Sequence, residues 1–293
     1  MQPMFLNLKP QTPEEREAAI AWARELLHDA DRVLIGAGAG LSTAAGHDYG
    51  GERFQKTFSE YIKRYGMTDM YSGGFYPFPT AEDRWAFWAR NATVNCLGES
   101  ALPLYLDLYE WAKTRDYFVL TTNADLQFEK AGFDPERIFA TQGDYAHIQC
   151  VTGKHGIRSN AELFAAIEED TGAGERTRIT DSSLVPKCDV CGKPMEMHLR
   201  VDDSFVQDDA WYAAEKRYRN FVEQIPAKPT LLLELGVGWN TPVWIRMPFE
   251  RIAQSTGSPL VRMNYDDAAV NPELPAAVGI EGDIAETFPQ IAK

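Results

Sequence analysis

Apolar and polar residues alternate along the chain in a way that predicts helices and short strands in turn. Thr12 and Glu15 form a capping box around Pro13, and apolar residues then recur at helical spacing as far as Leu27. A short apolar run, residues 33–35, follows and ends in a glycine-rich turn at 36–40. The succession of helix, strand and glycine-rich turn is typical of the first unit of a dinucleotide-binding α/β domain.

The alternation continues toward the C-terminus. Further strands are predicted at 117–121, 137–140, 230–235 and 260–263, and a strand–helix pair closes the chain. Helices are predicted near 102–114 and 209–224. Because strands that alternate with helices pair in parallel, we predict an α/β fold: a Rossmann-like parallel sheet that binds a dinucleotide, with an inserted smaller lobe.

Two segments interrupt this pattern. Residues 54–98 are helical and aromatic, which predicts an inserted helical lobe or lid, and 150–191 are polar with few strand signals, which predicts a small irregular lobe. We expect one unit spanning 1–293. Within it, 30–50, 99–145 and 228–293 form the dinucleotide-binding part, 51–98 the helical insert and 146–208 a small zinc-knuckle-like lobe.

The net charge limits the kinds of molecule that the protein is expected to bind, and the cysteine content indicates its cellular location. The 293 residues include 29 basic and 43 acidic side chains, a net charge of −14, which disfavours nucleic acids and anionic membranes as partners. No apolar run approaches the roughly 20 residues of a membrane span, and the first residues do not resemble a secretory signal. Four cysteines are too few for a disulfide scaffold, so we expect a cytoplasmic protein.

Polar residues follow six predicted strands, and the carboxyl ends of parallel strands are where such sheets bind ligands. The first group is the glycine turn, which departs from the G-x-G-x-x-G pattern because Leu41 is at the sixth position. Taken alone, it is equally compatible with a plain tight turn. The other groups lie at 121–125, 141–145, 236–242 and, after the last two strands, at Asn264 and 282–284.

Together these segments resemble the sirtuin family. Residues 38–46 resemble the sirtuin G-A-G-x-S-x-x-S-G loop, 122–125 resemble its Q-N-I-D, and 236–242, 264 and 282–283 resemble its distal NAD-binding segments, from about residue 31 onward. The resemblance implies that NAD contacts the following residues: Gly38, Ala39, Gly40, Ser42, Thr43, Asp48, Tyr49, Asn123, Asp125, Gln142, Gly236, Val237, Gly238, Asn240, Thr241, Asn264, Asp283 and Ile284.

Two departures from the sirtuin pattern concern the chemistry. The I-P-D-F-R segment is shortened to residues 47–50, and the His-Gly that supplies the catalytic base is Gln142-Gly143. The stretches 142–145 and 199–203 resemble the macrodomain-linked (class M) sirtuins. That resemblance implies ADP-ribosylation of a protein acceptor, a lipoyl-carrier protein, with a macrodomain hydrolase as a functional partner.

The residue chemistry agrees with transfer rather than deacylation. A deacylase needs a base that deprotonates a ribose hydroxyl, which histidine can do and a neutral amide cannot. Loss of a general base costs about 10²–10⁴ in rate, whereas cleavage of the nicotinamide bond needs positioning and charge stabilisation. We therefore predict an NAD-dependent protein ADP-ribosyltransferase in which Asn123 and Gln142 carry catalysis and Asp125 supports the nicotinamide-ribose end.

Two alternatives remain open at this point. The first is a deacylase that uses another base, with His47 or His147 as the candidates. The second is an NAD hydrolase or an NAD-sensing module, which would release free ADP-ribose or bind NAD without turnover.

The cysteines indicate a metal knuckle. Cys188 and Cys191 form a C-x-x-C pair, but Cys150 has no second cysteine nearby, and His155 is the candidate for a fourth ligand. A Cys₃His set would hold a structural zinc ion, since catalytic zinc keeps an open position. The alternative is a relic knuckle without metal. Cys96 stands alone on a helical stretch and is expected in the core.

Overall fold

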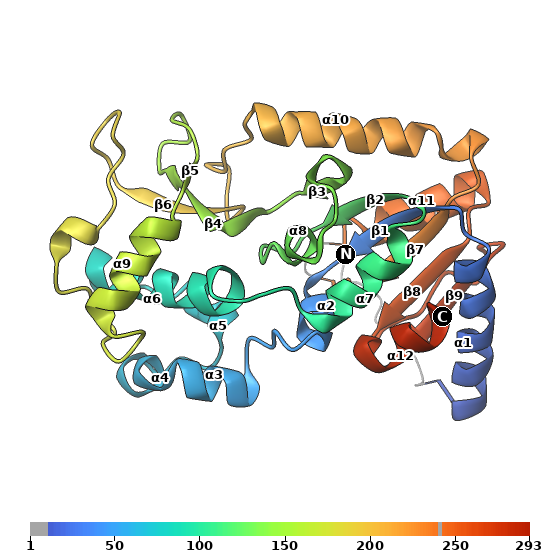
Figure 1. The fold of residues 1–293 in the computed structure, drawn as a ribbon, viewed down its shortest axis with the longest axis horizontal. Coiled ribbons are helices and arrows are strands. Elements are labelled where there is room, and N and C mark those ends of the chain that lie inside the picture. The colour runs from blue at the N-terminus through green and yellow to red at the C-terminus, as the bar shows by residue number, and fades with distance from the viewer. Residues whose placement is uncertain (1–10, 240–241) are drawn as a thin grey trace, which may run out of the picture.

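The protein has two lobes, a large one built on a parallel sheet and a small one built on helices and a short antiparallel sheet (Figure 1). The structure is a computed structural model and describes residues 11–239 and 242–293. Asn240 and Thr241, two of the predicted NAD contacts, lie outside the described residues.

The large sheet has six strands, all parallel, in the order β3-β2-β1-β7-β8-β9. Because β1 pairs with both β2 and β7, the winding direction reverses on either side of β1, and sheets of this kind bind ligands at that point. The predicted fold class is confirmed. The strands are β1 (Arg32–Ala37), β2 (Asp116–Thr121), β3 (Ile138–Ala140), β7 (Leu231–Leu235), β8 (Leu260–Asn264) and β9 (Ala277–Glu281).

Helices cover both faces of this sheet because both sides of its strands are apolar. On β1, Val33 and Ile35 join one hydrophobic cluster while Leu34 joins the other, as the two-residue period of a strand requires. The first face is covered by α1 (Pro13–His28), α2 (Ala39–Ala44), α7 (Pro103–Ala112), α8 (Gln127–Ala131) and α12 (Ile284–Ile291). The second is covered by α10 (Asp209–Glu223) and α11 (Arg246–Thr256), and the 3₁₀ turns η2 (Pro135–Arg137) and η4 (Ile225–Ala227) adjoin α10.

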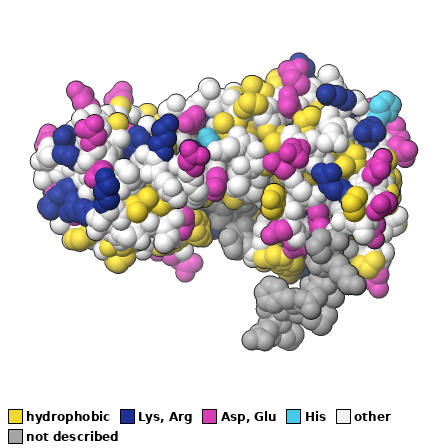
Figure 2. All heavy atoms as spheres, turned by 90° about the horizontal axis from the view of Figure 1, so that it is seen from below, with side chains coloured by type: hydrophobic (Ala, Val, Ile, Leu, Met, Phe, Trp, Pro, Cys, Tyr) yellow, Lys and Arg dark blue, Asp and Glu magenta, His cyan; other side chains and the backbone are white. Residues whose placement is uncertain are grey.

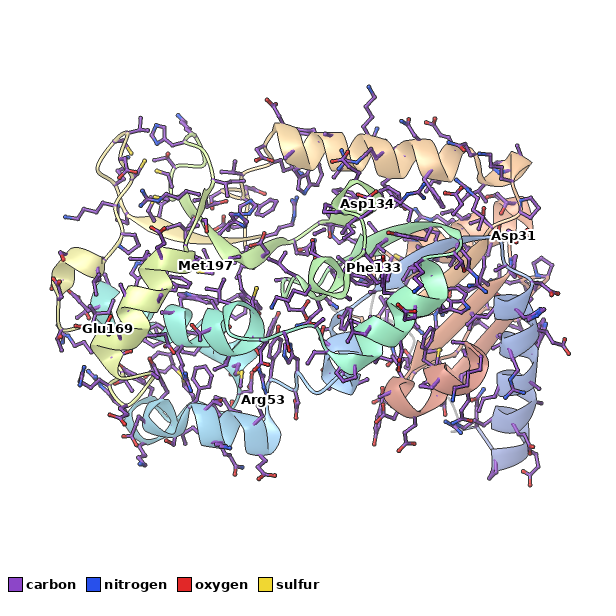
Figure 3. The ribbon with its side chains drawn as sticks, in the orientation of Figure 1. Asp31, Arg53, Phe133, Asp134, Glu169 and Met197 are labelled. Carbon is purple, nitrogen blue, oxygen red and sulfur yellow. The ribbon has the colours of Figure 1, made fainter. Side chains whose placement is uncertain are left out.

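The small lobe combines the two interrupting segments in one core. Trp85 on α6 packs near Phe164 on α9 with ring centroids 6.0 Å apart, and Met197 on β6, labelled in Figure 3, belongs to the same cluster. Its elements are α3 (Gly51–Thr57), α4 (Ser59–Tyr65), α5 (Met70–Gly73), α6 (Ala81–Ala92), the π-helical turn η1 (Thr93–Leu97), α9 (Ala161–Thr171), η3 (Ser182–Leu184), and the sheet β5-β4-β6, with β4 (Gly143–Cys150), β5 (Arg158–Ser159) and β6 (Met195–Leu199).

The segment 150–191 is more regular than expected, because it contains the 11-residue helix α9. Only one narrow face of this helix is buried, at Phe164, Ile167 and Thr171, so its apolar period is short and easily missed. Strand β4 was also missed. Its register shifts between Gly143 and Ile148, and this irregularity breaks the alternation that normally marks a strand.

Seen from below, the molecule narrows between the lobes, and basic side chains gather on the small lobe (Figure 2). A surface cavity of about 640 Å³ lies among them. Its Lys63 and Arg64 are paired with Glu60 and Asp83, so the cavity does not present a field of one sign. Across residues 11–239 and 242–293, every helix is too short or too polar to cross a bilayer.

Candidate active site

A cavity of about 380 Å³ opens at the carboxyl ends of β1 and β7, where the winding direction reverses, and extends to the small lobe. Five of the six polar strand ends, those of β1, β2, β3, β7 and β8, contribute to it, together with α5, α6 and the residues around the end of β6. Its lining consists of Gly38, Ala39, Gly40, Met70, Tyr71, Gly74, Phe75, Trp88, Asn91, Thr122, Ala124, Gln142, Tyr145, Leu199, Arg200, Val201, Gly236, Val237, Gly238 and Asn264.

The two glycine-rich loops touch each other at the base of the cavity. Gly40 donates a 2.9 Å backbone hydrogen bond to Gly236, and a Cβ atom on Gly38 would lie only 2.7 Å from the same carbonyl oxygen. Gly236 has a φ of +62°, and its Cβ would lie 2.2 Å from the nitrogen of Leu41. Only glycine allows this approach, so the glycines predicted to bind a dinucleotide are also required by the fold.

Asn123 is held beneath the first glycine loop. Its Nδ2 atom lies 3.0 Å from the Gly38 carbonyl oxygen, 3.1 Å from Ser42 Oγ and 3.1 Å from the Tyr105 hydroxyl. Its Oδ1 atom is buried and has no hydrogen-bond partner among the described residues. Its neighbours Thr122 and Ala124 line the cavity, whereas Asn123 itself is not among the lining residues.

Asp125 belongs to the same buried cluster. It accepts a 2.5 Å hydrogen bond from the Ser42 hydroxyl and one of 3.1 Å from the backbone N–H of Gln127. Burial raises the pKa of Asp125, and these hydrogen bonds only partly offset it. The chain turns sharply here, since Leu126 has a φ of +57°, a conformation that side chains other than glycine rarely adopt. Asp125 therefore positions the loop and does not line the cavity.

Gln142 lines the cavity directly before β4, and its contact with the substrate stays a prediction. Its Nε2 donates a 3.0 Å hydrogen bond to Thr141 Oγ1, which fixes the amide at the cavity wall. The following Gly143 has a φ of +76°, and a Cβ there would lie 1.9 Å from the His198 carbonyl oxygen. Gln142 is therefore a candidate for function, whereas Gly143 is required by the close pairing of β4 with β6.

Arg200 is a candidate that our reading of the sequence missed. It follows β6, lines the cavity beside Gln142, and its backbone N–H donates to the Gln142 carbonyl oxygen at 3.0 Å. Its guanidinium carbon lies 4.4 Å from the centre of the Phe205 ring, and its Nη2 atom is buried without a partner among the described residues. Burial lowers the pKa of Arg200. The segment 199–203 carries only a family resemblance, and no local pattern in it indicates that the chain folds back onto Gln142.

Neither histidine considered as an alternative base lines the cavity. His47 is 4% exposed, and burial, reinforced by Arg53 (labelled in Figure 3) and Lys130, lowers its pKa to about 4. His147 bonds to Asp144 at 2.7 Å, and this hydrogen bond raises its pKa. A deacylase base at either position would therefore have to act from outside the cavity wall.

The remaining predicted NAD contacts divide into two groups. Ala39, Gly238, Val237 and Asn264 line the cavity, and Asn264 also donates a 2.9 Å hydrogen bond to the Val237 carbonyl oxygen. The other predicted contacts among the described residues do not line the cavity. Thr43 and Asp48 are exposed, Tyr49 hydrogen-bonds to the Tyr145 hydroxyl at 2.9 Å, Asp283 caps α12 by accepting from the N–H of Ala285, and Ile284 is buried in the core.

The four predicted metal ligands meet at one point of the small lobe. The ligand atoms of Cys150, His155, Cys188 and Cys191 all lie within 4.8 Å of one another. The Cys150 and Cys191 sulfur atoms are 3.7 Å apart, and His155 Nδ1 lies 3.4 and 3.3 Å from the sulfur atoms of Cys150 and Cys188. Tetrahedral zinc with ordinary Zn–S and Zn–N bonds requires edges of about 3.8 and 3.6 Å. The residues therefore fit zinc in a closed, structural site.

The chain matches no protein-family model. It is 30% identical over 256 residues to a protein ADP-ribosyltransferase of Staphylococcus aureus (strain Mu50 / ATCC 700699), covering 87% of this chain and 80% of that protein. The chain belongs to the protein ADP-ribosyltransferase family of this relative. The fold is that of solved sirtuin structures: a Sir2 homologue mutant bound to 2′-O-acetyl ADP-ribose has a TM-score of 0.57 at 14% identity, covering 92% of this chain and 93% of that one. A structure from a study of sirtuin substrate affinity has a TM-score of 0.55 at 18% identity, covering 91% and 95%.

A second relative is a longer protein, about half of which matches this chain. A probable bifunctional ADP-ribose hydrolase/ADP-ribosyltransferase of Fusarium oxysporum f. sp. cubense is 31% identical over 288 residues, which are 93% of this chain. This chain spans 47% of that protein's length. The predictions of a sirtuin-type fold and of an NAD-dependent ADP-ribosyltransferase are confirmed.

Proposed function

We propose that the protein transfers ADP-ribose from NAD to a side chain of a protein acceptor, and that nicotinamide is released in the cavity between the glycine loops and the small lobe. The observation that carries this proposal is the chemistry of the lining. Arg200 is the one charged side chain among the described lining residues, and Gln142 is an amide where a deacylase needs a base. A site of this kind can hold a ribose and stabilise charge, but it does not supply a proton acceptor near neutral pH.

Each residue of the site has a proposed task. The glycine loops at 36–40 and 236–238 accommodate the dinucleotide, because their glycines have no side chains that would keep its phosphates from the backbone N–H groups. Asn123 offers its unpaired Oδ1 to a ribose hydroxyl, and Gln142 orients the ribose or the incoming nucleophile. Arg200 offers its unpaired Nη2 to an anionic or carbonyl oxygen of either substrate. Asp125 and Ser42 act as positioning residues beneath them.

The identity of the protein that accepts ADP-ribose is inferred from the resemblance to class M sirtuins. We propose a lipoyl-carrier protein as the acceptor, as the class M segments 142–145 and 199–203 imply. A macrodomain-type hydrolase that removes the modification is proposed as a functional partner. The fungal relative, named for both an ADP-ribose hydrolase and a transferase activity, supports a link between the two reactions.

Three further proposals concern organisation. We propose the division into a dinucleotide-binding part (30–50, 99–145 and 228–293), a helical insert (51–98) and a knuckle lobe (146–208). The separate sheet core supports the boundary of the first part, and the other two parts share one core. We propose that the four clustered side chains, Cys150, His155, Cys188 and Cys191, bind structural zinc. We propose a cytoplasmic location, which agrees with cysteines that are all free.

The test is incubation with labelled NAD and a carrier protein, with and without lipoylation, followed by intact mass and by assay of an acyl-lysine peptide. The proposal expects a mass increase of one ADP-ribose on the carrier and nicotinamide release without matching deacylation. Free ADP-ribose as the sole product would instead indicate a hydrolase.

A further inference from the structure

Aromatic rings, and not a carboxylate, surround the charge of Arg200. Its guanidinium carbon lies 4.4 Å from the centre of the Phe205 ring, 5.4 Å from that of Trp244 and 5.7 Å from that of Trp211. All three distances are within the range of a cation–π contact. Its Nε atom donates a 3.2 Å hydrogen bond to the Thr141 carbonyl oxygen, and no carboxylate among the described residues forms an ion pair with it. The guanidinium therefore keeps its positive charge uncompensated at the cavity wall.

Arg246 shows the more usual arrangement of an arginine beside a tryptophan in this protein. Its guanidinium carbon lies 4.4 Å from the centre of the Trp239 ring, but it also forms a 3.0 Å ion pair with Asp267. A charge that is paired in this way has little field left for a ligand. The difference between the two arginines is therefore the carboxylate, which Arg246 has and Arg200 lacks.

The rings around Arg200 come from three segments of the chain. Phe205 follows β6 in the same segment as Arg200, Trp211 lies near the start of α10, and Trp244 lies in the connection between β7 and α11. Both tryptophans pack against the hydrophobic cluster on the second face of the large sheet, whereas β6 belongs to the small lobe. The two tryptophans thus contact Arg200 across the junction of the lobes.

The position of Trp244 is set by the end of β1. The next residue, Ile245, is fully buried, and a Cβ on Gly36 would lie only 2.5 Å from its side chain. Ile245 therefore packs directly on the strand that leads into the first glycine loop. Val237, earlier in the same connection, lines the cavity. One connection of the large lobe thus carries both a part of the second glycine loop and a ring that contacts Arg200.

We propose that Trp244 is a positioning residue for Arg200. Its ring holds the guanidinium beside Gln142 without neutralising it, because the face of an aromatic ring attracts a cation but carries no net charge. The inference rests on the proposed function, in which this charge meets an oxygen of the substrate. It adds that the lobe with the glycine loops determines where the charge lies.

The experiment is a double-mutant cycle between Trp244 and Arg200. Trp244→Leu removes the ring and keeps an apolar side chain, Trp244→Phe keeps a ring, and each is also combined with Arg200→Gln. Trp111→Leu is the matched control, because Trp111 lies 4.4 Å from the guanidinium carbon of Arg115 and neither residue lines the cavity. Release of nicotinamide from labelled NAD is followed with enzyme in excess and a lipoylated carrier domain present, so that slow variants still give a rate constant.

In the protein with Arg200, Trp244→Leu should lower the rate constant about three- to thirtyfold, as loss of one partly buried cation–π contact predicts. Trp244→Phe should recover most of this loss. In the Arg200→Gln background, Trp244→Leu should cost less than about twofold, because the contact is already gone. Trp111→Leu should have the same small effect in both backgrounds. An equal loss from Trp244→Leu with and without Arg200 would overturn the inference, since Trp244 would then support only the fold.

The intact mass of the carrier separates failure of this inference from failure of the proposed function. If the cycle shows coupling but the product is free ADP-ribose, Trp244 does position Arg200 and the proposed transfer to a protein is wrong. If the carrier is modified but the two losses are additive, the proposed function stands and the positioning role is wrong. Absence of nicotinamide release by the wild type would contradict both.

Discussion

The hydroxyl of Ser42 donates a 2.5 Å hydrogen bond to the carboxylate of Asp125, and this contact joins the glycine loop after β1 to the loop after β2. Ser42 also lies 2.8 Å from the Tyr105 hydroxyl and 3.1 Å from Asn123 Nδ2. The candidate site therefore has a buried polar foundation that holds the two loops in one arrangement.

Ser42→Ala should weaken both the fold and the reaction. It leaves the buried Asp125 carboxylate without its shortest hydrogen bond, and an unsatisfied buried acceptor costs about 1–3 kcal/mol. Urea unfolding measures the loss, with Ser255→Ala on the exposed end of α11 as the control. We also expect KM for NAD to rise in Ser42→Ala. Unchanged stability and an unchanged KM would show that the contact does not position the loops.

Asn123→Ala should abolish nicotinamide release while the fold survives. The variant removes the unpaired Oδ1 that we assign to a ribose hydroxyl, together with the amide contacts to Gly38 and Tyr105. Tyr105→Phe is the comparison, because it removes one amide contact and leaves Oδ1 in place. Nicotinamide release and circular dichroism are the measurements. A well-folded Asn123→Ala with undiminished turnover would contradict the assignment.

His47 should make the protein less stable in mild acid. Burial beside Arg53 and Lys130 lowers its pKa from 6.5 to about 4. Between those values the unfolded chain binds a proton that folded His47 excludes, so stability falls as the pH decreases through this window. His47→Leu cannot titrate, and it also removes two unpaired ring nitrogens. The difference in unfolding free energy between wild type and His47→Leu, measured from pH 7 to 4, should change in favour of the variant as the pH falls. If the difference in unfolding free energy stayed constant from pH 7 to 4, protonation of His47 would not be coupled to unfolding.

Zinc content tests the knuckle. The purified protein is expected to contain about one zinc ion per chain, and Cys188→Ala should lose it along with several degrees of thermal stability, because metal binding is coupled to folding. Cys96→Ala is the control, since Cys96 is buried within η1 and does not belong to the ligand cluster. Retention of zinc by Cys188→Ala would show that the cluster is not the site.

The features of the fold and site that could be predicted from the sequence are those that depend on residues close together in the chain. The strands 33–35 and 230–235 are short apolar runs, and their glycine-rich ends mark the point where the sheet binds ligands. The C-x-x-C at 188–191 likewise indicated a knuckle whose ligands do meet.

The remainder depends on contacts between distant segments. Arg200 reaches Gln142 only because β6 pairs with β4 across more than forty residues, and the shifted register of β4 hides that pairing from the sequence. Trp88 falls in the aromatic stretch 54–98, and only the structure shows that its buried N–H has no partner among the described residues. The resemblance predicts that Asp283 contacts NAD, and the structure adds that its side chain caps the first turn of α12.

Gln142 provides the most direct test of the central claim, which is that this site transfers ADP-ribose because it lacks a base. Wild type, Gln142→His and Gln142→Ala are compared for ADP-ribosylated carrier by intact mass and for deacylation of an acyl-lysine peptide. We predict that Gln142→Ala loses transfer by about tenfold or more, as loss of a positioned polar group at a reacting centre does. Gln142→His should lose much of the transfer and gain little or no deacylation. Wild-type deacylation at a rate that matches nicotinamide release would contradict the account, because another residue would then be serving as the base.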